Sequence, residues 1–157
     1  MKKTIFIATV MATSALSTPV LARDFSGPRV EVTAGAEGAS RGVTTKDVQY
    51  GVGAGYDVQF GKVVAGVEAG VDNVLDRRNI AVAGRLGYAA NEGVLLYTKV
   101  GYSNWKPLAN RKLEGLRIGA GVEAKLLGPV FGTVEYRHTD FGAVKTNGGL
   151  VGVGLRF

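Results

Sequence analysis

The sequence contains no cysteine in its 157 residues. This absence excludes disulfide bonds, thiolate metal sites, a cysteine nucleophile and the lipid anchor of bacterial lipoproteins. Histidine is almost absent as well, because His138 is the single one. After residue 22 the sequence holds no run of 18 consecutive apolar residues, so it predicts no transmembrane helix. It also lacks a low-complexity linker, and we expect no second domain.

Residues 1–22 have the order of a secretory signal peptide. Two lysines at 2–3 precede an apolar core at 5–16, and Val20-Leu21-Ala22 forms a small-residue cleavage site. A membrane anchor is the alternative, but the apolar run is short for a spanning helix and ends at Ser17-Thr18-Pro19. We therefore expect cleavage after Ala22 and a location beyond the inner membrane of a bacterium.

The expected mature chain, residues 23–157, has a length typical of one domain. It carries 17 basic and 13 acidic residues, which gives a net charge of +4. The charges are spread singly, without the basic run or aromatic platform of a nucleic-acid-binding protein. We expect no nucleic-acid partner, whereas the positive charge is compatible with anionic lipopolysaccharide.

The clearest pattern lies in residues 47–60, which read DVQYGVGAGYDVQF. Every second residue from Val48 to Phe60 is apolar, and those between are polar or glycine. Successive side chains of a β-strand point to opposite faces, so this segment predicts a strand with one apolar and one polar face. A tilted strand of about 9–11 residues crosses a membrane, and this segment is long enough.

The same alternation recurs along the mature chain and predicts eight strands, at residues 28–36, 47–60, 63–72, 79–89, 94–103, 113–125, 130–139 and 148–157. Short periplasmic turns are expected near 61–62, 90–93 and 126–129. Longer external loops are expected near 37–46, 73–78, 104–112 and 140–147. Even strand number and alternating connection length predict an all-β fold, an eight-stranded antiparallel up-and-down transmembrane β-barrel.

Alternation alone also fits a soluble lipocalin-like barrel, whose apolar face points inward. Three features favour the membrane barrel. The glycines lie mainly on the polar face, where a narrow lumen needs space for large charged neighbours. The aromatic residues of the apolar face form two levels, as interfacial girdles do: Tyr50, Tyr102 and Tyr136 near the loops, and Tyr56, Phe60, Tyr88 and Phe157 near the turns.

The third feature is that both signs of charge occur on the polar face. Buried charges require partners, so we expect a lumenal network of ion pairs. Its predicted members are Glu31, Glu68, Arg85, Lys99, Arg117, Glu123, Glu135, Arg137 and Arg156.

Several segments resemble the small OmpA/OmpX-type outer-membrane β-barrel proteins, within the porin-like group of Gram-negative bacteria. The segments are Gly-Pro-Arg-Val-Glu-Val at 27–32, Gly-Val-Gly-Ala-Gly-Tyr at 51–56, Leu-Leu-Tyr-Thr-Lys-Val-Gly-Tyr at 95–102, Gly-Ala-Gly-Val-Glu at 119–123, Val-Glu-Tyr-Arg at 134–137 and Val-Gly-Val-Gly-Leu-Arg-Phe at 151–157. The resemblance implies an outer-membrane location and a barrel surrounded by lipid. It also implies that Phe157 is a signal read by the barrel assembly machinery. The external loops are shorter than in adhesins of this group.

A lumen filled with charged side chains predicts a non-enzymatic envelope protein with a structural role, and we expect a monomer. The alternatives are a narrow porin-like channel for ions or small solutes, favoured by the many lumenal glycines, and the lipocalin-like binder. A lipid-modifying enzyme would need a nucleophile beside a base. His138, followed by Thr139 and Asp140, has no such spacing to Ser103 or Ser40.

We expect no cofactor and no metal. Gly51-x-Gly53-x-Gly55 lacks the helix that follows a nucleotide loop, and Glu37, Asp72 and Asp76 do not have the spacing of a calcium loop. Trp105, Lys106 and Arg111 are candidates for contact with lipopolysaccharide headgroups.

Overall fold

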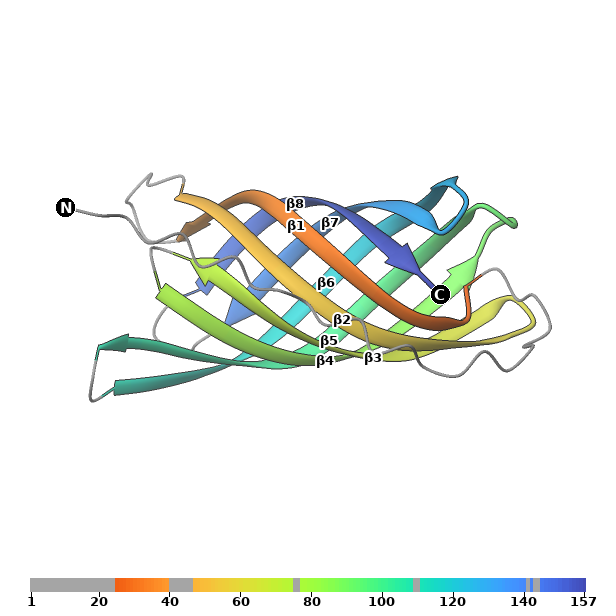
Figure 1. Ribbon diagram of the computed structural model, residues 1–157. Helices are drawn as coiled ribbons and strands as arrows, with labels where there is room; N and C mark the ends of the chain where they lie inside the picture. The colour runs from red at the N-terminus through yellow and green to blue at the C-terminus, as the bar shows by residue number, and fades with distance from the viewer. Residues whose placement is uncertain (1–24, 40–46, 75–76, 109–110, 141, 143–144) are drawn as a thin grey trace.

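The computed structural model describes residues 25–39, 47–74, 77–108, 111–140, 142 and 145–157. They form eight strands: β1 (Gly27–Ala39), β2 (Asp47–Phe60), β3 (Val63–Val74), β4 (Arg77–Ala89), β5 (Val94–Leu108), β6 (Arg111–Leu127), β7 (Val130–Asp140) and β8 (Lys145–Arg156). Each strand pairs antiparallel with its neighbours in sequence, and β1 pairs with β8 to close the barrel. Figure 1 shows the strands running obliquely around a single barrel. The predicted eight-stranded antiparallel barrel is confirmed.

Among the described residues, no helix has the length and apolar character needed to cross a membrane.

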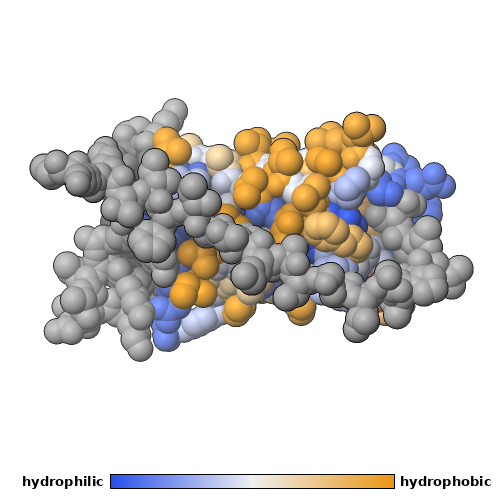
Figure 2. Space-filling model, in the orientation of Figure 1, coloured by the Kyte–Doolittle hydropathy of each residue, from blue (hydrophilic) through white to orange (hydrophobic). Residues whose placement is uncertain are grey.

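Inward and outward side chains alternate along the strands, as the period of two requires. On β2, Val52 and Tyr56 are exposed on the outside, whereas Asp57 is buried in the lumen. The strand register pairs outward-facing apolar residues with each other; for example, Val52 pairs with Val71 on the outer face. On the side seen in Figure 2, hydrophobic residues gather over the middle of the barrel. The lipocalin-like alternative is therefore wrong, since the apolar face points outward.

Tight turns connect the strands at one end of the barrel, which we call the turn end. Gly61 lies between β2 and β3, and Gly128 lies between β6 and β7. Both have a positive φ, at 61° and 56°, which glycine adopts without steric cost. Residues 90–93 connect β4 to β5 at the same end. The opposite end, where the other connections lie, is called the loop end.

The strands extend further toward the loop end than the sequence pattern predicts. The expected loop at 104–112 is wrong, because β5 continues to Leu108 and β6 begins at Arg111. The predicted loops 37–46, 73–78 and 140–147 are likewise shortened by β1, β3, β4, β7 and β8. Backbone hydrogen bonds continue the hairpins where neither face is apolar, so alternation no longer reveals the strand. Pro107 fits within β5 because the register shifts between Trp105 and Leu108, and proline is tolerated at such irregularities.

Candidate functional site: the lumen

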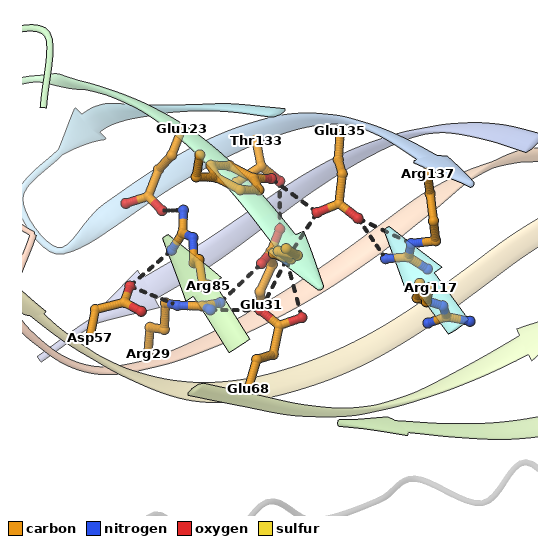
Figure 3. A network of polar contacts seen from close by, with 12 residues as sticks. Arg29, Glu31, Asp57, Glu68, Arg85, Arg117, Glu123, Thr133, Glu135 and Arg137 are labelled. Atoms are coloured by element: carbon orange, nitrogen blue, oxygen red, sulfur yellow. Dashed lines mark hydrogen bonds and ion pairs between the residues drawn. The ribbon is translucent and has the colours of Figure 1, made fainter. Parts of the chain in front are cut away.

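The lumen is the candidate site, because the inward-facing positions carry the charged side chains of the strands. The structure places all nine predicted lumenal charges inside the barrel, where each takes part in an ion pair. It adds three residues that the prediction did not include: Arg29, Asp57 and Asp72. Alternation already placed these three on the polar face, but their partners depend on how the strands meet across the barrel. Figure 3 shows most of this network.

The layer nearest the turn end is centred on Asp57. Its Oδ2 atom accepts hydrogen bonds from three guanidinium groups: Arg29 Nε at 3.0 Å, Arg85 Nη1 at 2.8 Å and Arg156 Nη1 at 3.0 Å. Glu123 joins two of the same arginines, at 2.6 Å from Arg85 Nη2 and 2.8 Å from Arg156 Nη2. Strands β1, β2, β4, β6 and β8 thus meet at one cluster, which we call the Asp57 cluster.

The middle layer is centred on Lys99, whose Nζ lies 2.9 Å from Glu68 Oε2 and 2.9 Å from Glu135 Oε2. Arg29 Nη2 donates to the same Glu68 at 2.6 Å and links this layer to the Asp57 cluster. Glu31 Oε2 lies 3.5 Å from Arg29 Nη1, and its Oε1 accepts from Thr133. Charge-assisted bonds of this kind are stronger than neutral ones and hold the side chains in place.

The layer nearest the loop end is centred on Asp72, which pairs with Arg117 and, at 3.4 Å, with Arg137 Nη1. Arg137 Nη2 also lies 3.0 Å from Glu135 Oε1, so this layer is connected to the middle one. Asp72, weighed in the sequence as a residue of a calcium loop, thus lies inside the lumen with two arginines as its partners.

Charges of opposite sign balance in the described lumen. Its ion pairs contain six cationic residues and six anionic residues. Isolated buried charges would be costly, and balanced, hydrogen-bonded pairs offset that cost. The pairs therefore tie side chains from different strands together across the described lumen.

Tyr97 fills the lumen between the layers and explains one of its glycines. Its ring lies 4.0 Å from the Arg85 guanidinium carbon, and its hydroxyl donates to Glu135 Oε2 at 3.1 Å. A Cβ at Gly121 would come within 2.7 Å of that ring, so only glycine leaves room for it. Phe131 packs over Gly154 in a comparable way, with Arg156 5.5 Å from its ring centre. Glycine on the polar face thus makes space for large lumenal side chains.

One cavity lies among the charged side chains of the described lumen. A cavity of about 40 Å³ lies between the middle layer and the loop-end layer, and it is bordered by charged residues of both layers, including Glu68, Lys99, Asp72 and Arg117. A water molecule needs about 10–15 Å³ of such space, so the cavity suits a few waters and no solute.

The aromatic residues predicted as girdles all lie on the outer face and are exposed. Tyr50, Tyr102 and Tyr136 belong to the loop-end parts of their strands, and Tyr56, Phe60, Tyr88 and Phe157 to the turn-end parts. At the loop end, Asn73 Nδ2 donates to the Tyr50 hydroxyl, and Tyr136 donates to Asn147 Oδ1 at 2.9 Å.

The residues weighed as a catalytic pair do not meet. His138 points outward, and its Nδ1 lies 2.7 Å from Asn147 Oδ1. Ser103 is buried in the lumen and donates to Asn79 Oδ1 at 2.8 Å, so the barrel wall separates it from His138. Ser40 and Asp76 lie outside the described residues.

The described part of the chain holds no cluster of histidine, aspartate or glutamate arranged to bind a metal. The side chains of Glu37, Trp105, Lys106 and Arg111 lie outside the description. The headgroup contact suggested for the last three stays a prediction.

Comparison with known proteins decides the family. The model of the outer membrane protein beta-barrel domain matches residues 8–157. The chain belongs to this outer-membrane β-barrel family. It is similar to the 25 kDa outer-membrane immunogenic protein of Brucella ovis, with 30% identity over 130 residues, or 71% of this chain. The match spans 64% of that relative's length.

Solved structures of the same fold include the Neisserial surface protein A, with a TM-score of 0.62 and 18% identity over 84% of this chain and 98% of that one. The outer membrane enzyme PagL is also similar, with a TM-score of 0.60 and 12% identity over 82% of this chain and 99% of that one. At such identities the likeness concerns the fold alone. The location of this family member is the outer membrane, as predicted.

Proposed function

We propose that this outer-membrane barrel is a non-enzymatic structural protein of the envelope, with a lumen closed by its own side chains. The observation that carries the proposal is the continuous ion-pair network from Arg156 at the turn end to Arg117 toward the loop end. An eight-stranded barrel is just wide enough for its interior side chains to fill it, and here they are large, charged and tied together. The cavity of about 40 Å³ is lined by members of these pairs, including Glu68, Lys99 and Asp72.

The class of fold supports a proposed orientation and proposed partners. In outer-membrane barrels the short turns face the periplasm, so we place the turn end there and the loop end outside. The described lumenal ion pairs are balanced in charge, and the mature chain is expected to carry a net charge of +4. This excess favours association with anionic lipopolysaccharide. The exposed Phe157 on the last strand is suited to recognition by the assembly machinery.

A narrow channel is the second candidate, because inward glycines such as Gly53 and Gly70 border the cavity and leave one part of the lumen unfilled. An enzyme is not favoured, since Ser103 and His138 lie on opposite faces of the wall.

Single-channel recording separates the two candidates. The purified protein is first shown to be folded by a gel band whose mobility changes on boiling. It is then added to a planar lipid membrane. We expect no current steps above those of a protein-free membrane. Reproducible steps from the folded protein would contradict the structural proposal and favour the channel.

A further inference from the structure

Phe25 lies just before β1 and occupies the turn-end mouth of the barrel. Its side chain is 0% exposed and packs in one apolar cluster with Val64, Ala89 and Leu95. These partners come from the turn-end parts of β3, β4 and β5. A phenylalanine outside the strands is thus more deeply buried than most apolar side chains of this protein, which face the membrane. We call this cluster the floor.

Polar contacts fix the backbone around Phe25. Its N–H donates to Gln59 Oε1 at 3.0 Å, and its carbonyl accepts from Arg156 Nη1 at 2.9 Å. Ser26 Oγ accepts from the Gln59 N–H at 2.9 Å. The Lys125 ammonium lies 5.8 Å from the centre of the Phe25 ring. Phe25 and Ser26 therefore contact β2, β6 and β8 through these interactions, in addition to the apolar contacts of Phe25 with β3, β4 and β5.

Arg156 couples the floor to the charges above it. The nitrogen that donates to the Phe25 carbonyl also lies 3.0 Å from Asp57 Oδ2, and the other terminal nitrogen lies 2.8 Å from Glu123. The floor and the Asp57 cluster are therefore neighbouring levels of one lumen.

Exposure of the lumenal charges changes along the barrel. The side chains of Asp57, Arg85 and Glu123 are 0–1% exposed, beside the floor, although Arg156 of the same cluster is 9% exposed. Glu68, at 15%, and Arg117, at 10%, lie further toward the loop end. The deepest burial of charged side chains thus occurs in the Asp57 cluster, next to the apolar floor.

We infer that Phe25 is a stopper that closes the turn-end mouth, so that the lumen is shut by two barriers in series. The first is the apolar floor, and the second is the ion-pair network, which begins at the Asp57 cluster. This inference rests on the proposed function, since it concerns how a closed lumen is kept closed. It assigns Phe25, two residues before β1, a role in the seal.

Thiol labelling tests the stopper. The chain has no cysteine, so only an introduced cysteine can react with the label. Val64→Cys reports on the floor, and Ser103→Cys reports on the lumen toward the loop end, since both residues are 0% exposed. The folded variants are treated with a charged, water-soluble maleimide. With Phe25→Ala added, we expect labelling at position 64 to accelerate roughly tenfold or more, because local opening is no longer required. Labelling at position 103 should stay unchanged.

Two further variants serve as controls. Phe60→Ala removes an exposed ring at the same end of the barrel and should leave both rates unchanged. Phe25→Leu keeps most of the apolar volume and should keep position 64 protected. Equal labelling of position 64 with and without Phe25 would overturn the stopper. Equal acceleration at both positions would also overturn it, because Phe25 would then support the whole fold rather than one mouth.

The labelling outcome is independent of the proposed function. Current steps from the wild-type protein would contradict the closed lumen, whatever the labelling shows. A silent wild-type protein whose position 64 does not respond to Phe25→Ala would contradict the stopper alone.

Discussion

Three guanidinium groups share one carboxylate oxygen of Asp57, so a single side chain neutralises charge from β1, β4 and β8. Removing one member of a buried ion-pair group costs more than the pair contributes, because the remaining charges stay buried without compensation. Exposed pairs behave differently, since water screens both partners. Lys145 and Asp140, 3.2 Å apart on the outer surface, are such a pair.

Asp57→Asn should therefore lower the free energy of unfolding by about 3–5 kcal/mol, because three arginines lose their shared negative charge. Asp140→Asn is the matched control and should change it by about 1 kcal/mol or less. Urea titration of the folded protein in lipid vesicles, followed by the heat-sensitive gel band, measures both. Similar midpoints for the two variants would show that the Asp57 cluster is not a stabilising centre.

The effect of replacing a strand glycine with alanine depends on whether the added Cβ would point into the lumen or away from the barrel. At Gly121 a Cβ would meet the Val134 carbonyl oxygen at 2.5 Å and the Tyr97 ring at 2.7 Å, whereas at Gly149 nothing described lies within 4 Å. Gly121→Ala should destabilise the barrel by about 1–3 kcal/mol through overpacking. Gly149→Ala should be neutral or stabilise it by about 0.5–1 kcal/mol, because alanine loses less backbone entropy on folding. The same urea titration compares them, and a reversed order would contradict the lumenal role of Gly121.

At the scale of strands, the sequence predicts structure well only where a strand has one face toward lipid. Val48 to Phe60 alternate strictly, and β2 is observed from Asp47 to Phe60. The hairpin of β5 and β6 continues to Leu108 and Arg111 without such alternation. Backbone pairing depends little on side-chain polarity, so these strand ends leave no signal in the hydropathy pattern.

At the end of the last strand, the proposed role of Phe157 in assembly can be measured separately from its contribution to stability. The Phe157 side chain is 69% exposed, and its backbone N–H donates to the Pro28 carbonyl of β1 at 2.9 Å. Phe157→Ala keeps that hydrogen bond, so the purified variant should refold in detergent to the same heat-sensitive band. In cells, the amount in the outer membrane should fall several-fold if the assembly machinery reads the ring.

Phe60→Ala is the control for this experiment, because Phe60 is 64% exposed at the same end of the barrel. It should reach the outer membrane at the wild-type level. Equal losses for both variants would indicate a girdle effect and contradict a recognition role for Phe157.

At the scale of the whole molecule, pairing across the lumen could not be predicted from the sequence. Alternation places Arg29 and Glu68 on the polar face, but they are 39 residues apart and meet only through the closed barrel. The same holds for Tyr97 and Glu135, which are 38 residues apart. The sequence did not predict that Phe25 is buried in the barrel, because this residue precedes the first alternating segment and resembles an ordinary linker residue.

A lumen with two barriers in series should conduct only when both are removed. Arg85→Ala with Glu123→Ala deletes one cation and one anion that face each other at 2.6 Å, so the lumenal charge stays balanced. This pair of changes leaves the floor in place, and Phe25→Ala alone leaves the Asp57 cluster in place. We expect neither variant to give current steps in a planar membrane. The triple variant should give small ones, because the middle and loop-end layers, which border the cavity, still narrow the path. Steps from the Arg85 and Glu123 variant alone would show that the floor is no barrier to ions. Steps from Phe25→Ala alone would show that the Asp57 cluster is no barrier to ions. Either result would mean that only one of the two barriers closes the lumen.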